Sequence, residues 1–303
     1  MSLPPDLKIT EVFKACPFTL SAEVIPPRNG AGRETIFSQI KSLHDAGAQY
    51  LAVTKGAGGS LRGGSLPIAQ AIKERFQMPC VAHFTCRDLT PEEVENQLID
   101  HHFFGIRNIL ALRGDPPNGV SDWQPREGSY SYAYQLMEQI RNLNKGKYLE
   151  RKGFKSSSSE ATDFCIGAAC YPDLENKQER VDYFRMKVDA GAEFAISQML
   201  FDAGSFARFM DETAKFKVPI LPGTRFLKSQ EHAHKIAKKF QVPVPHDYLK
   251  RLPETDAESS PQQTLDAFMM LTEDLKEVGA PGIHIFVLTD TDLAGKALRS
   301  LQS

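Results

Sequence analysis

The stretch FCIGAACYPDLENKQERVDYFRMKVDAGAEFAISQML, residues 164–200, decides the fold because it contains a complete strand–helix–strand unit. It begins and ends with short apolar runs, which are typical of strands buried on both faces of a parallel sheet. Between them Val181, Phe184 and Val188 recur at helical spacing, and Gly191 follows as a helix stop. We therefore predict two parallel strands joined by an amphipathic helix.

The same unit recurs along the chain. Apolar runs of this kind occupy residues 18–25, 50–56, 80–86, 108–114, 164–171, 194–200, 218–224 and 283–289. Eight strand–helix units in 303 residues predict an α/β protein with a (β/α)8 TIM-type barrel. A doubly wound open sheet is the structural alternative.

The clearest helix signal follows the third run. Thr90 suits an N-cap, Pro91 suits the first helical position, and Glu93 completes a capping box. The apolar residues that keep helical spacing after this cap are Val94, Leu98, Ile99 and Phe103. We expect a helix over this stretch.

Residues 1–303 are expected to form a single barrel catalytic domain with two insertions. Residues 146–163 are polar, include four consecutive serines and are expected to form a surface loop. Residues 242–262 carry four prolines and many charges, and are expected to form an excursion over one face of the barrel.

Composition excludes several classes of protein. The 36 basic and 38 acidic residues nearly cancel, which argues against a protein that coats nucleic acid. With 41% hydrophobic and 24% charged residues, disorder throughout the chain is excluded. No apolar run approaches the ~20 residues of a membrane-spanning helix, and the N-terminus lacks the pattern of a signal peptide. We expect a cytoplasmic protein of the size of an enzyme.

No pattern favours a metal site. The five cysteines form no CxxC pair, and four of them lie in or beside apolar runs, so buried reduced thiols are the expectation. His232 and His234 fall on a predicted helix without a neighbouring Glu or Cys, which favours a solvated helix face. His101 and His102 are interpreted in the same way.

Polar side chains gather where the predicted strands end. In a (β/α)8 barrel the active site lies at the carboxyl ends of the strands. The polar groups at those ends include Glu23, Thr54, Lys55, His83, Arg113, Asp115, Tyr171 and Gln198. Six strands thus direct polar groups to one end of the barrel.

Glu23 is the most informative of these residues because it interrupts an apolar strand. A buried carboxylate is costly unless it is paired or neutral. It could form an ion pair with Arg28, Arg87 or Arg113, or it could be a general acid that burial keeps protonated. The other residues also have purely structural interpretations. Asp115 could cap a turn, and His83 and Gln198 could be core residues whose hydrogen bonds are satisfied within the barrel.

The glycine-rich stretch KGAGGSLRGG, residues 55–64, does not match the GxGxxG dinucleotide fingerprint, since Leu61 stands at the last glycine position. Its backbone N–H groups could hold an anion, or the stretch could be a plain turn.

The ordered motifs SAEVIPPR, VTKGAGGS, HFTCRD, GIRNILALRGDPP, AACYPD, KVDAGAEFAISQMLFD and LPGT resemble those of the methylenetetrahydrofolate reductases. The resemblance runs from about residue 18 to 225, with an echo at 284–289, and is closest to the short bacterial form without a regulatory domain. It implies a barrel that binds FAD, takes electrons from NADH or NADPH and reduces methylenetetrahydrofolate. It also implies association into a homo-oligomer, with no nucleic-acid or membrane partner.

The resemblance assigns roles to individual residues. It implies that Glu23 is the general acid, that Asp115 stabilises the developing cation, and that Gln198 contacts the pterin. The implied FAD contacts are Thr54, Lys55, Ala57, His83, Leu112, Arg113, Gly114, Asp115, Tyr132, Ala133, Ala169, Tyr171 and Lys187. The implied substrate contacts are Glu23, Thr54, Asp115, Gln198 and Phe286.

The chain departs from the family pattern in several places. Lys55 replaces a usual Tyr, the loop at 173–176 lacks a common His-Pro-Glu stretch, and Thr289-Asp290 replaces a common Asn-Arg pair. The turn at the seventh run continues as Thr224-Arg225-Phe226. Two other functions stay open: a Schiff-base lyase or aldolase that uses Lys55, and a folate- or flavin-binding subunit that needs a partner protein.

Overall fold

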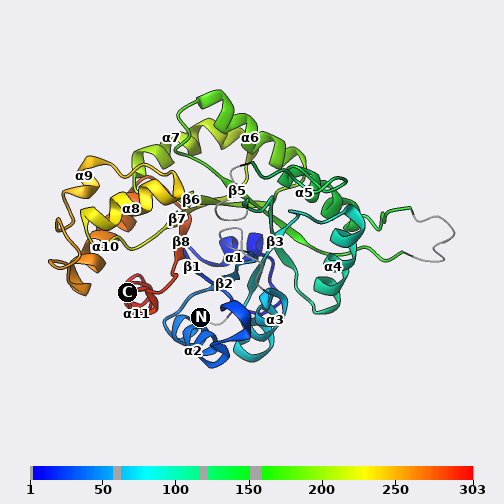
Figure 1. The fold of residues 1–303 in the computed structure, drawn as a ribbon, viewed down its shortest axis with the longest axis horizontal. Helices are drawn as coiled ribbons and strands as arrows, with labels where there is room; N and C mark the ends of the chain where they lie inside the picture. Colours follow the sequence, from blue (N-terminus) through cyan, green and yellow to red (C-terminus); the bar gives the residue numbers. More distant parts are fainter. Residues whose placement is uncertain (1–2, 57–62, 117–121, 151–158, 303) are drawn as a thin grey trace.

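Eight parallel strands close into a barrel in the order in which they occur along the chain (Figure 1). The computed structural model describes residues 3–56, 63–116, 122–150 and 159–302. The strands are β1 (Thr19–Val24), β2 (Tyr50–Val53), β3 (Cys80–Thr85), β4 (Asn108–Leu112), β5 (Cys165–Cys170), β6 (Phe194–Met199), β7 (Ile220–Thr224) and β8 (Gly282–Phe286). Each overlaps one predicted run, so the predicted barrel is confirmed and the open sheet is wrong.

Helices surround the strands, except for α1, which lies across one end of the barrel (Figure 1). The helices are α1 (Ile9–Ala15), α2 (Arg33–Asp45), α3 (Ser65–Phe76), α4 (Pro91–Phe103), α5 (Ala133–Leu143), α6 (Lys177–Asp189), α7 (Ala203–Thr213), α8 (Gln230–Phe240), α9 (His246–Leu249), α10 (Pro261–Glu277) and α11 (Thr291–Ser300). Short 3-10 turns cover Arg28–Gly30 and Ala214–Phe216. Within the described residues no helix is long and apolar enough to cross a membrane.

The capping box at the start of α4 is confirmed. The Glu93 N–H donates to Thr90 Oγ1 at 3.3 Å, and the Thr90 N–H donates to Glu93 Oε2 at 2.7 Å. The predicted helix is present as well, with Val94 and Leu98 fully buried and Phe103 83% exposed. At 100° per residue, Phe103 lies about 180° around the helix from Val94.

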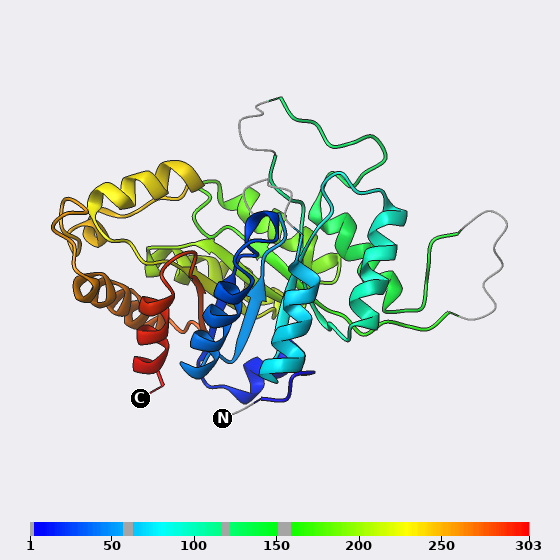
Figure 2. The same cartoon turned by 60° about the horizontal axis from the view of Figure 1, so that its bottom comes forward.

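Apolar side chains fill the amino-terminal end of the barrel interior. Val81, Leu110, Phe194 and Leu221 pack inside it, and α1 covers them from below with fully buried residues such as Ile9. The Ile9 N–H donates to Asn108 Oδ1 at 2.9 Å, which joins α1 to β4. Figure 2 shows both termini on one side of the molecule, while the chain between β4 and α5 rises on the other. Apolar side chains thus fill the amino-terminal end of the barrel, and the polar residues at the carboxyl ends of the strands lie on the side away from the termini.

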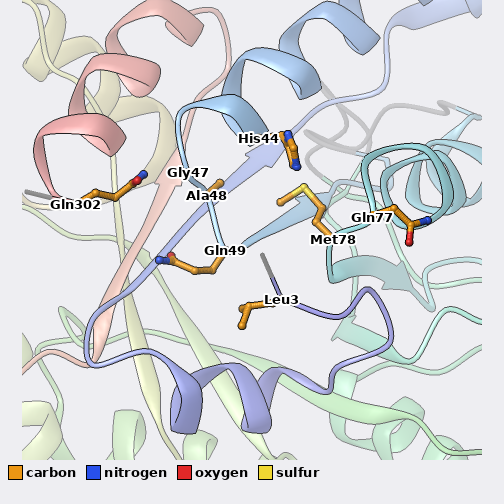
Figure 3. A pocket seen from close by; sticks show the side chains of 8 residues that line it. All are labelled: Leu3, His44, Gly47, Ala48, Gln49, Gln77, Met78 and Gln302. Atoms are coloured by element: carbon orange, nitrogen blue, oxygen red, sulfur yellow. The ribbon is translucent and has the colours of Figure 1, made fainter. Parts of the chain in front are cut away.

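A cavity of about 390 Å³ lies near the termini and not at the polar strand ends (Figure 3). Its lining consists of Leu3, His44, Gly47, Ala48, Gln49, Gln77, Met78 and Gln302. The three glutamines make hydrogen bonds to backbone groups: Gln49 accepts from Leu20, Gln77 donates to Glu74, and Gln302 donates to Ala46. We therefore assign this cavity to packing between loops.

The two insertions differ in how they are anchored. The segment 242–262 contains α9 and is tied to the barrel wall, since the Gln230 N–H donates to Pro253 O at 2.9 Å and Arg251 pairs with Asp274 at 2.8 Å. Of the segment 146–163, residues 151–158 lie outside the described residues, and the remainder contains no helix or strand. The five cysteines are unpaired and four are buried, as expected.

Candidate active site

Glu23 lies near the end of β1 with its carboxyl group between two histidines. Its Oε2 is 3.9 Å from Nε2 of His83 on β3 and 3.9 Å from Nε2 of His284 on β8. All three side chains are buried, with Glu23 6% exposed. Among the described residues these imidazoles are the basic groups within ion-pair distance of Glu23. The alternative of a buried pair with Arg28, Arg87 or Arg113 is therefore not found.

Ser21 joins His284 to the backbone of β8. Its Oγ lies 3.1 Å from Ile283 O and 2.9 Å from His284 Nδ1. Which of the two atoms donates in the second contact depends on the tautomer of the ring. Ser21 therefore holds the His284 ring in place, with Nε2 facing Glu23.

His83 is the second imidazole beside Glu23. Burial lowers the pKa of His83 to about 4, an effect that the charge of Glu23 only partly offsets. Its Nε2 is buried without a hydrogen-bond partner in the described chain. Glu23 is thus surrounded by groups that accept or share a proton and not by a fixed cation.

Phe286 forms a wall beside Glu23. The two residues are register partners between β1 and β8, and the Phe286 ring lies edge-on to His284 with centroids 5.4 Å apart. Gly223 on β7 makes room for this ring, since a Cβ there would lie 2.4 Å from Phe286 and 2.5 Å from the Ser197 carbonyl oxygen. Thr54, just after β2, is also buried, and its Oγ1 has no hydrogen-bond partner in the described chain.

Gln198 lies where the pairing of β6 with β7 shifts register between Ile196 and Met199. Its Oε1 accepts the Met199 N–H at 2.9 Å, so its carbonyl is engaged while its amide N–H groups form no bond within the described residues. The alternative interpretation, in which Gln198 only satisfies backbone groups, therefore holds for its carbonyl oxygen and not for its N–H groups.

The ends of β4 and β5 bring together charged and aromatic groups. Gly114 has φ +95°, and a Cβ there would lie 2.8 Å from Arg87 Cβ, so the chain needs glycine at this close approach. Arg87 donates to the Asp115 carbonyl, which holds this turn, while the Arg113 and Asp115 side chains are exposed.

Lys187 on α6 reaches the end of β5. Its ammonium donates to Ala169 O at 2.7 Å and lies 5.0 Å from the centre of the Tyr171 ring. Burial lowers the pKa of Lys187. Leu112, at the end of β4, is half-buried, and Tyr132 is exposed and stacks on Tyr134 beside Ala133 at the start of α5.

Comparison with known proteins decides the family. The family profile described as methylenetetrahydrofolate reductase matches residues 8–302. The chain belongs to the methylenetetrahydrofolate reductase family. The Escherichia coli 5,10-methylenetetrahydrofolate reductase is 29% identical over 283 residues, which cover 91% of this chain and 88% of that protein.

Other family members are longer than this chain. Methylenetetrahydrofolate reductase 1 of Schizosaccharomyces pombe is 27% identical over 279 residues, 89% of this chain but 43% of that protein. The chain thus spans less than half the length of such relatives. Among solved structures, an uncharacterised Clostridium thermocellum protein has the same fold with a TM-score of 0.58 and 14% identity, covering 98% of this chain and 99% of that one.

Two of the predicted site residues, Lys55 and Ala57, are not found beside Glu23. The Lys55 ammonium donates to Gln97 Oε1 at 2.6 Å and lies 4.0 Å from the centre of the Phe84 ring. Phe84 alternates with His83 along β3 and so faces the helices. Lys55 is therefore directed between β3 and α4, away from Glu23. Ala57 lies outside the described residues.

Sequence reasoning missed three residues near Glu23: Ser21, His284 and Arg225. Ser21 lies two residues before Glu23 on β1, and His284 lies two residues before Phe286 on β8. Side chains two residues apart on a strand share a face, and this period of two is the signal that could have found both residues. Arg225 follows β7 directly and is 7% exposed. Conversely, His101 is buried against Phe84, so its expected place on a solvated face is wrong.

Proposed function

We propose that this protein is a flavin-dependent methylenetetrahydrofolate reductase, which uses NADH or NADPH to form 5-methyltetrahydrofolate for one-carbon metabolism and methionine synthesis. The carrying observation is Glu23, a carboxyl group buried at the ligand-facing end of the barrel between two imidazoles. Family membership supports the proposal. So does the Clostridium thermocellum protein of the same fold, which is described as binding two copies of 5-methyl-5,6,7,8-tetrahydrofolic acid.

Glu23 is proposed as the proton donor. Opening the five-membered ring of the folate requires a proton on the departing nitrogen. The O–H bond of Glu23 breaks, an N–H bond forms, and the electron pair of the C–N bond goes to that nitrogen. The carboxylate that remains lies 3.9 Å from His284 Nε2, and it needs a proton before the next turnover.

Three further residues are proposed to position the folate. Asp115, as a carboxylate, stabilises the cation left by ring opening. The free amide N–H groups of Gln198 suit an acceptor on the pterin edge. Phe286 offers an apolar wall beside Glu23.

The residues at the strand ends fit a flavin dinucleotide. The buried Thr54 hydroxyl has no partner in the described chain, and the backbone at Gly114 leaves no room for a side chain. Thr54, Gly114 and Tyr171 would contact the flavin, while Arg113 and Lys187 would face its pyrophosphate. When bound, FAD would supply the hydride carrier between nicotinamide and folate.

The alternatives gain less support. The burial of Lys55 lowers its pKa to about 8, which would favour a Schiff-base amine, but its contacts with Gln97 and Phe84 direct it away from Glu23. Dependence on a partner protein, homo-oligomer formation and a cytoplasmic location stay predictions.

Replacing the proton donor tests the proposal. Glu23→Gln is expected to keep reduction of the bound flavin by NADH and to slow folate reduction by at least ~100-fold, because the amide cannot donate the required proton. Stopped-flow absorbance of the flavin measures both half-reactions. Glu95→Gln, at a 3% exposed carboxylate on α4, is the matched control and should leave both intact. Unchanged folate turnover in Glu23→Gln would show that the proton-donor assignment is wrong.

A further inference from the structure

Arg225 is a buried cation that forms no hydrogen bond or ion pair with the described residues. It directly follows β7 and is 7% exposed. Its Nε is buried with no hydrogen-bond acceptor in the described chain, and no carboxylate there lies within ion-pair distance of its guanidinium. The recorded neighbour of the guanidinium is the Phe240 ring, whose centre lies 5.8 Å away. A buried Nε that lacks an acceptor is unfavourable, so this position suits an external anion that the guanidinium could contact.

The nearby acidic group is already neutralised by another residue. Asp290, which follows β8, has a side chain 8% exposed, and its Oδ1 lies 3.2 Å from Lys228 Nζ. The direct ion-pair partner of Asp290 is therefore Lys228 and not Arg225. Burial lowers the pKa of Arg225, and the charges of Asp290 and Glu23 oppose this effect.

The location of Arg225 matches an anion site. Strands β7, β8 and β1 are neighbours in the closed barrel, so Arg225 and Asp290 lie at the same end as Glu23. In (β/α)8 barrels the loops after the seventh and eighth strands frequently hold phosphate groups. A guanidinium binds both carboxylate and phosphate with two parallel hydrogen bonds.

We propose that Arg225 anchors an oxyanion of the ligand that binds beside Glu23. This inference rests on the proposed function for the identity of the ligand: the oxyanion is then a carboxylate of the folate tail or a phosphate of the nicotinamide dinucleotide. Lys228 stays with Asp290 and does not contribute the primary contact.

Binding measurements separate the two sources. Arg225→Gln is compared with wild type by calorimetry, using 5-methyltetrahydrofolate against a tail-free methyltetrahydropterin, and NADH against reduced nicotinamide riboside. The variant is expected to bind one of the two anionic ligands about 10- to 100-fold more weakly, with no change for its uncharged analogue. The ligand that loses affinity identifies the source. The proposal would be overturned if Arg225→Gln bound all four ligands as tightly as wild type does. It would also be overturned if the variant lost as much affinity for an uncharged analogue as for the matching anionic ligand.

A matched variant controls for loss of charge. Arg251→Gln removes an arginine that is ion-paired with Asp274 at 2.8 Å in the excursion, and it should change no ligand affinity. Arg225→Lys should recover part of the lost affinity, since it restores the charge without the planar fork.

Thermal unfolding tests Arg225 independently of the reductase function. Inorganic phosphate or acetate is expected to raise the melting temperature of wild type more than that of Arg225→Gln. Without ligand, Arg225→Met should melt no lower than wild type, because it removes an unpaired buried charge. Equal stabilisation of both proteins by the anions, or a large loss of stability in Arg225→Met, would show that the guanidinium has an internal role. If wild type binds neither folate nor NADH, the proposed function fails, while the phosphate and acetate titrations still decide the role of Arg225.

Discussion

At the scale of single residues, the surroundings of Glu23 depend on how a few side chains are held. Ser21 Oγ lies 2.9 Å from Nδ1 of His284, and Nε2 of the same ring lies 3.9 Å from the Glu23 carboxyl group. Ser21 thus orients the ring that faces Glu23. Ser21 never touches the carboxyl group, so we regard it as a positioning residue.

Removing the Ser21 hydroxyl should therefore disturb reduction of the folate and not electron entry. Ser21→Ala is expected to slow reduction of the folate roughly tenfold while flavin reduction by NADH stays unchanged, because His284 loses the hydrogen bond that orients its ring toward Glu23. Stopped-flow rates across pH measure this effect, and Ser21→Thr should restore the rate. A parallel loss in both half-reactions would indicate general damage to the barrel.

His83 should make stability depend on pH. Its pKa is about 4 in the folded protein and 6.5 in the unfolded chain, so the unfolded state binds the extra proton first. Stability from the neutral ring is complete above about pH 6.5 and is lost as pH falls toward 4. We expect a loss of about 2 kcal/mol between pH 7 and pH 4.5.

Urea unfolding at the two pH values tests this expectation. His83→Gln should remove the contribution of His83 to the pH dependence, since glutamine does not titrate, while His101, whose pKa burial also lowers to about 4, keeps its own contribution. His234→Gln, on the exposed face of α8, should leave the dependence as in wild type. A His83→Gln protein with the full wild-type slope would assign that slope to other groups.

At the scale of elements, β7 carries a constraint that its composition does not reveal. Gly223→Ala would place a Cβ 2.4 Å from the Phe286 ring and 2.5 Å from a carbonyl oxygen of β6. We expect a loss of 1 to 3 kcal/mol, about the usual cost of overpacking, together with weaker folate binding. Urea unfolding and folate titration measure the two effects. Gly204→Ala is the control, since its Cβ would lie 3.4 Å from the nearest atom.

Elements also show how far the sequence predicts the structure. The apolar runs predict all eight strands, because strands buried on both faces need such runs wherever they occur in a barrel. The capping box at Thr90 is local and is predicted for that reason. The direction of Lys55 is not predictable in this way, because it lies two residues beyond β2, where alternation no longer holds.

At the scale of the whole molecule, the candidate site exists because the barrel closes. Ser21 and His284 are 263 residues apart and meet only when β1 pairs with β8. The motifs predict Glu23, but they cannot predict which side chains on other strands surround it. The same closure leaves Arg225 Nε without an acceptor among the described residues, a property that depends on every neighbouring element at once.

The two ends of the barrel divide its tasks, and this division gives a last prediction. Helix α1 closes the amino-terminal end with Ile9 and Val12, both fully buried, while ligand-facing groups occupy the other end. Ile9→Ala is expected to lower the free energy of unfolding by about 2 to 5 kcal/mol, through lost burial and a cavity. Lys14→Ala, exposed on the same helix, should change it by less than ~0.5 kcal/mol.

Neither change should alter binding at the carboxyl-terminal end. Close-packed interior side chains separate α1 from Glu23, and the affinity for NADH should stay within about twofold of wild type in the folded fraction of both variants. Urea unfolding and NADH titration on the same preparations provide the comparison. If Ile9→Ala weakens NADH binding as strongly as it weakens the fold, the two ends are coupled through the interior, and α1 belongs to the functional machinery as well as to the core.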